Sequence, residues 1–125
     1  MNKNAKSWVV ALRSGKFTQA RGRLNIRNTY CCLGVACELY IASGAEALTK
    51  IKFDEETSYD GETVCLPTIV QEWLGLTTVT GTFDPFNPEV SLDLTYMNDC
   101  VLNFNEIADL IESEPEGLFV KDVIA

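Results

Sequence analysis

Histidine is absent from this chain of 125 residues, and its absence excludes several common kinds of enzyme. The Ser-His and Cys-His pairs that activate most protein nucleophiles cannot be built without an imidazole. A zinc shell would need four thiolates here, and the five cysteines include no C-x-x-C pair. We therefore expect no hydrolase triad, no bound metal and no cofactor, and we favour a role other than catalysis.

Long apolar runs are also absent. No stretch reaches the roughly eighteen consecutive apolar residues of a membrane-spanning helix. The apolar residues near the N-terminus are interrupted by Arg13, and no small-residue cleavage site of a signal peptide follows them. The five cysteines are an odd number, and Cys31 and Cys32 are adjacent, which favours reduced, buried thiols over a disulfide framework. These features predict a soluble, cytosolic protein that does not enter a membrane.

Acidic residues are missing from the front of a chain that is acidic overall, with a formal net charge of −8. Residues 1–30 hold seven lysines and arginines and no carboxylate, a charge of +7, whereas residues 31–125 hold three lysines and all 18 acids, a charge of −15. One interpretation is that the basic segment packs on the acidic body through ordinary surface ion pairs. The other is that part of the segment stays free to hold an anion.

Hydrophobic periodicity predicts four helices. They cover residues 5–14, with Asn4 as the cap and Gly15 after the end; residues 29–44, with Thr29 as the cap; residues 67–75; and a helix that starts after Asn103 and ends before Pro115. The helix over residues 29–44 is apolar almost all round, which predicts a central, buried helix. In the last of these, Glu106 stands at the third helical position, as a capping box requires. Gly34 and Ala36 in the apolar helix would permit a neighbouring element to approach closely.

Strand-like segments occupy much of the remaining chain. Residues 16–30 contain Gly22 as a turn residue and resemble an extended hairpin or a strand with a turn. Residues 51–53 and 63–66 predict a second hairpin around Asp60 and Gly61. Two further β-rich runs, residues 76–83 and 89–97, flank a loop that contains Pro85 and Pro88. The length fits one domain, so we predict a single α+β domain over residues 1–125, with about four helices packed on an antiparallel sheet.

Five blocks of the sequence also resemble a known group of proteins. In chain order they read ALRSGKFTQARGRL, YCCLGVACELY, LPTIVQEWLGL, YMND and FNEIADLIE, and only residues 45–63 and 77–90 fall outside the likeness. Together they resemble a widespread set of small, uncharacterised bacteriophage proteins. The resemblance implies a phage accessory protein that acts in the cytosol of an infected bacterium on host machinery or host defences. It implies no catalytic residues.

The segment after the first helix is the candidate binding site. Arginine guanidinium groups bind phosphate through bidentate hydrogen bonds, a lysine ammonium adds positive charge, and an aromatic ring can stack on a nucleotide base. The sequence RSGK is not a phosphate loop of the Walker kind, because the upstream glycine and the spacer are missing. Basic residues are also favoured at the end of a helix for its dipole alone. The candidate ligand-binding residues are Arg13, Ser14, Lys16, Phe17, Gln19, Arg21 and Arg23.

Glu38 is the other residue that the sequence singles out. A lone acid in an apolar helix must reach water or find a cation, because an unpaired buried charge is very costly. Arg13, Arg21 or Arg23 could supply that cation, and the alternative is that Glu38 points to solvent.

These observations leave two main functional classes. The first is a non-enzymatic binder of a nucleotide or another phosphorylated small molecule, for example a signal of host defence. The second is an acidic inhibitor that presents a face like that of a nucleic acid to a basic host defence protein, with Glu106, Asp109 and Glu112 on its last helix. Duplex DNA comes third as a partner, because the acidic body would repel it and only the basic N-terminal segment could attract it. Assembly with copies of itself stays open.

Overall fold

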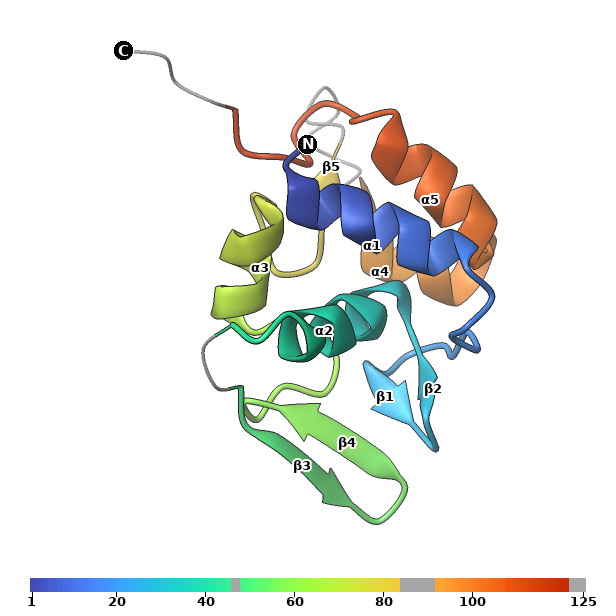
Figure 1. Cartoon of the computed structure of the whole chain (residues 1–125). Helices are drawn as coiled ribbons and strands as arrows, with labels where there is room; N and C mark the ends of the chain where they lie inside the picture. Colours follow the sequence, from blue (N-terminus) through green and yellow to red (C-terminus); the bar gives the residue numbers. More distant parts are fainter. Residues whose placement is uncertain (46–47, 84–91, 122–125) are drawn as a thin grey trace.

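The computed structural model describes residues 1–45, 48–83 and 92–121, which form an α+β fold, as the sequence predicts (Figure 1). Its helices are α1 (Lys3–Arg13), α2 (Cys32–Ala42), α3 (Thr68–Leu74), α4 (Leu94–Tyr96) and α5 (Phe104–Glu112), with a π-helical turn η1 (Met97–Val101) after α4. Its strands are β1 (Asn25–Ile26), β2 (Thr29–Tyr30), β3 (Lys50–Phe53), β4 (Glu56–Tyr59), β5 (Thr82–Phe83) and β6 (Leu92–Asp93).

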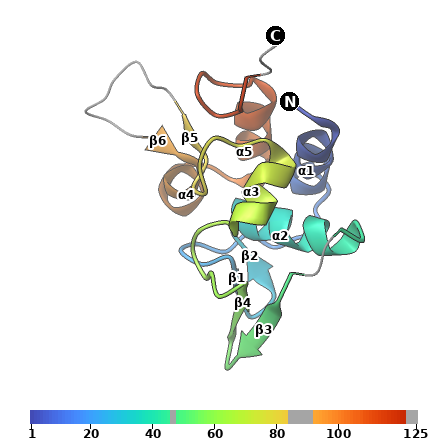
Figure 2. The same ribbon diagram turned by 90° about the vertical axis from the view of Figure 1, so that its left-hand side faces the viewer.

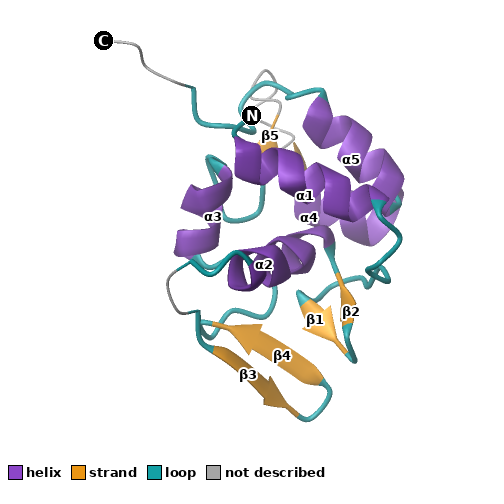
Figure 3. Cartoon of the chain, viewed as in Figure 1, coloured by secondary structure: helices purple, strands orange, loops and turns teal. Residues whose placement is uncertain are grey.

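The described strands form two antiparallel sheets. The larger sheet has the strand order β2-β1-β4-β3, and β5 pairs with β6 in the smaller one. The larger sheet lies at one end of the molecule, while the helices gather at the other (Figure 3). A view turned by 90° shows β5 and β6 beside α4 (Figure 2).

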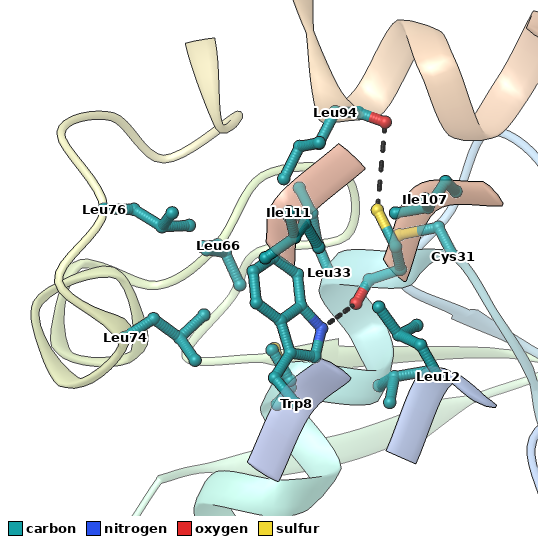
Figure 4. Close-up of a cluster of buried hydrophobic side chains, with 14 of the residues drawn as sticks. Trp8, Leu12, Cys31, Leu33, Leu66, Leu74, Leu76, Leu94, Ile107 and Ile111 are labelled. Atoms are coloured by element: carbon teal, nitrogen blue, oxygen red, sulfur yellow. Dashed lines mark hydrogen bonds between the residues drawn. The ribbon is translucent and has the colours of Figure 1, made fainter. Parts of the chain in front are cut away.

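Helix α2 lies among the other helices and supplies much of the core. It is apolar almost all round, and its residues from Cys32 to Cys37 are buried. The indole of Trp8 in α1 is fully buried against it and donates a hydrogen bond from Nε1 to the carbonyl of Cys32 at 2.8 Å (Figure 4). The prediction that this apolar helix is buried is confirmed.

Gly34 brings α2 against the chain that enters β1. A Cβ atom added at Gly34 would lie 1.8 Å from the carbonyl oxygen of Leu24, so no larger residue fits without a backbone shift. The close approach that the sequence predicts at this position is therefore confirmed.

Asparagine side chains cap the first turns of α1 and α5, and the start of α1 differs from the predicted one. Asn103 caps α5, and Glu106 completes the predicted capping box. Helix α1 begins two residues earlier than expected, because Asn2 rather than Asn4 accepts the capping bond from the N–H of Ala5. Gly15 follows the end of α1 with a φ of +75°, as expected for a glycine in that position.

The two predicted hairpins have different turns from those expected. The first turns at Arg27 and Asn28, both with positive φ, rather than at Gly22, and Thr29 belongs to β2 instead of capping α2. In the second, β3 pairs with residues 56–59 rather than 63–66, and Asp60 with Gly61 follows β4. The predicted partner of β3 was wrong because the run EETSY is polar and gives no strand signal, although it contains β4, of which Thr57 and Tyr59 are buried.

Residues 94–101 are helical, although the sequence predicts a strand over residues 89–97. The carboxylate of Asp93 accepts a hydrogen bond from the N–H of Tyr96 at 2.7 Å and starts α4. This cap overrides the alternating pattern that favours a strand. The predicted loop with Pro85 and Pro88, like Val90, lies outside the described residues.

Candidate functional site

Arg13 joins the end of α1 to the outer face of α5. Its Nη1 lies 2.8 Å from Oδ1 of Asp109, and its Nη2 lies 3.3 Å from Oε2 of Glu112. The hydrogen bond with Asp109 is the main cause that raises the pKa of Arg13. All three side chains are exposed, so these pairs contribute little to stability and leave the guanidinium accessible.

Ser14 and Lys16 form the turn after α1. The hydroxyl of Ser14 donates to the carbonyl of Ala11 at 2.6 Å and accepts from the N–H of Lys16 at 3.2 Å. The hydroxyl therefore shapes the turn, and Lys16 is exposed, with no ion pair to any residue that the structure describes.

Gln19 belongs to a buried polar network centred on Asn98 of η1. Its Nε2 donates to Oδ1 of Asn98 at 3.0 Å and to the carbonyl of Leu102 at 3.0 Å. Asn98 is fully buried; its Oδ1 also accepts from the N–H of Cys32 at 3.1 Å, and its Nδ2 donates to the carbonyl of Ala20 at 2.8 Å. Both ends of the Asn98 amide are satisfied, so the network fixes the fold at this point.

Arg21 and Arg23 are each held by other parts of the chain. Nη1 of Arg21 donates to the carbonyl of Asp99, the middle residue of η1, at 2.6 Å. The N–H of Gly22 donates to the Asp99 carboxylate at 2.8 Å. Arg23 lies with its Nε 2.9 Å from Oε1 of Glu56 in β4. Arg13, Arg21 and Arg23 thus have three different partner segments, α5, η1 and β4.

A shallow depression lies where α1 ends and α5 begins. Its volume is about 310 Å³, and it gathers three of the predicted binding residues, Arg13, Phe17 and Gln19, with Gly15. The other lining residues are Leu12, Asn103, Phe104 and Asn105. Phe17 is half-buried, and its ring meets that of Tyr30 edge to face, with 5.3 Å between centroids. The other four predicted residues, Ser14, Lys16, Arg21 and Arg23, do not line this depression.

Glu38 finds its cation in β3. Lys50 places Nζ 3.0 Å from both carboxylate oxygens of Glu38, and the hydroxyl of Tyr59 donates to Oε2 at 2.7 Å. The expectation that Arg13, Arg21 or Arg23 pairs with Glu38 is therefore wrong. Burial, and then the bond to Glu38, raise the pKa of Tyr59, which stays a neutral donor. The cluster ties the β3–β4 hairpin to α2.

The cysteines are all free thiols, as the sequence predicts. Cys31, Cys32 and Cys37 are buried, and burial raises the pKa of Cys31 to about 11 and raises the pKa values of Cys32 and Cys37 well above the ordinary value for a thiol. A buried thiol with a raised pKa is inert as a nucleophile at neutral pH. Within residues 1–45, 48–83 and 92–121, no group of three or more His, Cys, Asp or Glu side chains could hold a metal ion.

Sequence reasoning missed Asn98 and Asp99, which organise this part of the molecule. Their block, YMND, is part of the family likeness, but Asn98 and Asp99 directly follow a run that alternates like a strand. The signal that could have found them is that FTQARG and YMND both belong to that likeness and both carry amide side chains.

The comparisons with known proteins give a family without an assigned activity. No curated protein and no solved structure matches the chain. No described helix has the length and apolar character needed to cross a membrane. A family model matches residues 1–115, and the chain therefore belongs to the family described as Domain of unknown function (DUF8296).

Proposed function

We propose that this protein binds a phosphorylated small molecule without transforming it, at the depression between the end of α1 and the start of α5. The observation that carries the proposal is that Arg13, Phe17 and Gln19 line one cavity of about 310 Å³. That volume is at the lower end of the range for small-ligand sites. A nucleotide would place its base against Phe17 and its phosphate near Arg13.

The start of α5 adds donors to this site. The first N–H groups of an α-helix have no acceptor within the helix, and Oδ1 of Asn103 takes only that of Glu106 at 2.9 Å. The N–H groups of Phe104 and Asn105 therefore belong to the positive end of the helix dipole, which favours an anion. Lys16 does not line the depression, but it is exposed and next in the chain to Gly15, which does, so its ammonium adds positive charge to this region.

The neighbouring carboxylates set the strength of binding. Asp109 and Glu112 already share Arg13, so a phosphate must compete with them for the guanidinium. The site is open and exposed, so its electrostatic attraction is screened by salt. We expect affinity to fall as ionic strength rises.

The biological form of this proposal is a bacteriophage accessory protein that sequesters a nucleotide signal of host defence. It is supported by the five sequence blocks that resemble small phage proteins, and by the lack of histidine. Sequestration requires binding alone, which suits a cavity without a nucleophile and base in contact.

A thermal-shift assay of the full chain tests the proposal, with inorganic phosphate, nucleoside phosphates and sugar phosphates as probes. A ligand that binds only the folded protein stabilises it by about 2.7 kcal/mol at a hundredfold excess over Kd. We expect Arg13→Ala, which removes a guanidinium that lines the depression, to reduce the shift, while Lys6→Ala, at an exposed lysine outside the depression, leaves it unchanged. The proposal is wrong if none of the probes raises the Tm and no ligand is released from the purified protein for mass spectrometry.

A second candidate is an acidic face that binds a basic host defence protein. It is favoured by the exposure of Glu106, Asp109 and Glu112 on α5. Arg13 neutralises part of this charge, and Glu106 serves the capping box, so lysine at these positions would also disturb the fold. The cleaner variants are Asp109→Asn and Glu112→Gln, which should weaken capture of a basic host protein while the Tm changes little.

A further inference from the structure

Strand β3 lies at an open edge of the larger sheet. It pairs with β4 on one side, and no strand in the described part of the chain pairs with its other side. All four of its residues are exposed. The β3–β4 hairpin extends away from the helices in both views of the ribbon (Figures 1 and 2).

The register decides which main-chain groups face outward. The carbonyl of Thr49 accepts from the N–H of Asp60 at 2.7 Å, directly before the paired residues of β3 and β4. Hydrogen-bonded pairs alternate along antiparallel strands, so Ile51 and Phe53 direct their main-chain groups to β4. The N–H and C=O groups of Lys50 and Lys52 therefore form the open edge.

The side chains of β3 divide between the two faces of the sheet. Lys50 and Lys52 lie opposite Tyr59 and Thr57, which are buried, so the two lysines are on the face toward α2. The other face carries Ile51 and Phe53, with exposed fractions of 54% and 83%. The strand thus presents cations on one face and large apolar side chains on the other.

We propose that the outer edge of β3 accepts an extended segment of a partner protein, in which acidic residues alternate with apolar ones. Such strand addition gains affinity from main-chain hydrogen bonds and specificity from alternate side chains. Carboxylates of the partner would face Lys52, which has no ion pair to a described residue, and Lys50, which Glu38 already holds. Apolar side chains of the partner would cover Ile51 and Phe53.

Charge argues against a second copy of this chain as the occupant. Two copies could pair through β3 as antiparallel strands related by a twofold axis. If the axis passes through Ile51, Lys50 of one copy faces Lys52 of the other. If it passes through Lys52, the two Lys52 residues face each other. Like charges directly opposite each other destabilise a strand pair. Edge lysines protect sheets from self-association in this way, and an acidic strand removes that penalty.

This inference does not depend on the proposed small-molecule site. That depression is lined by residues from α1, α5 and the turn after α1, and none of them belongs to the β3–β4 hairpin. Failure of either proposal leaves the other in place.

The test uses the full chain, labelled with ¹⁵N, and three synthetic peptides followed by NMR. The acetylated peptide Glu-Val-Glu-Val-Glu-Val should shift the amide signals of β3, while its Lys-Val counterpart and a version with a central proline should not. Lys52→Glu should weaken binding of the Glu peptide about tenfold by reversing a facing charge. Phe53→Ser should weaken it too, whereas Lys3→Glu, at an exposed lysine of α1, should leave it unchanged.

Three results would overturn the inference. One is equal binding of the acidic and basic peptides, and another is a set of shifted amides outside the hairpin. The third is a concentration-dependent dimer in analytical ultracentrifugation that Phe53→Ser disrupts, which would assign the edge to a second copy. The signals of the unbound variants report directly whether each of them is folded.

Discussion

Gln19 and Asn98 are 79 positions apart in the chain, and the side-chain amide of Gln19 donates to that of Asn98 at 3.0 Å. This bond joins the basic segment after α1 to the turn η1. Asn98 in turn accepts from the main chain at the start of α2, so three separate segments meet at one buried amide. The relationship gives Gln19 a structural role, in addition to its place on the rim of the depression.

Replacing Asn98 with alanine should destabilise the fold strongly. The change leaves the N–H of Cys32 and the carbonyl of Ala20 buried without a partner, and we expect a loss of roughly 3 kcal/mol in the free energy of unfolding. Urea denaturation followed by tryptophan fluorescence would measure it. Asn105→Ala, at an exposed position of α5, is the matched control and should change stability by about 0.5 kcal/mol or less.

Arg21→Ala and Lys16→Ala should behave differently. Arg21 donates to the carbonyl of Asp99, so its loss should lower the free energy of unfolding by about 1 kcal/mol, whereas Lys16→Ala should leave it unchanged. Thermal melts without ligand compare the two variants. An Arg21→Ala protein as stable as the parent, but unable to respond to phosphate compounds, would instead place Arg21 in the binding site.

Gly34→Ala should be among the most damaging single substitutions. The added methyl group would overlap the carbonyl oxygen of Leu24, and we expect a cost of about 3 kcal/mol or more from overpacking. Gly44→Ala is a useful comparison, because that residue has a φ of +76° and nothing within 4 Å of an added Cβ. It should lose only about 1 kcal/mol, from backbone strain. Similar denaturation midpoints for the two variants would contradict the close approach.

Stability should decline in mildly alkaline solution because of the buried thiols. The pKa of Cys31 rises from 9.0 to about 11 on folding, so the unfolded chain loses its proton first as the pH increases. The contribution of this thiol is complete below about pH 9 and is lost between pH 9 and 11, by roughly 2–3 kcal/mol. Tm values measured from pH 7.5 to 10.5 should fall, and Cys31→Ala should reduce the slope. Cys100→Ser, at an exposed thiol, should keep it.

Local sequence patterns determined the helices well where the cap and the apolar face agree. Asn103, Glu106 and the apolar positions of α5 all indicate one helix, and the structure has it. The apolar composition of α2 likewise indicates a buried central helix. The absence of histidine, and the division of charge between residues 1–30 and 31–125, can also be read from the sequence alone.

Tertiary structure determined which strands pair and which residues the charged side chains contact. The sequence contains several segments that could pair with β3, and packing of Tyr59 and Thr57 selects residues 56–59. The cation for Glu38 is Lys50, which only that pairing brings near, and Arg21 meets Asp99 only when η1 forms. Capping and helical periodicity act over three or four residues, whereas these contacts join segments 12 to 78 positions apart. Local hydrophobic and capping patterns therefore do not tell which distant residue becomes the partner of a charged side chain. Packing of the whole core determines which distant segments lie side by side.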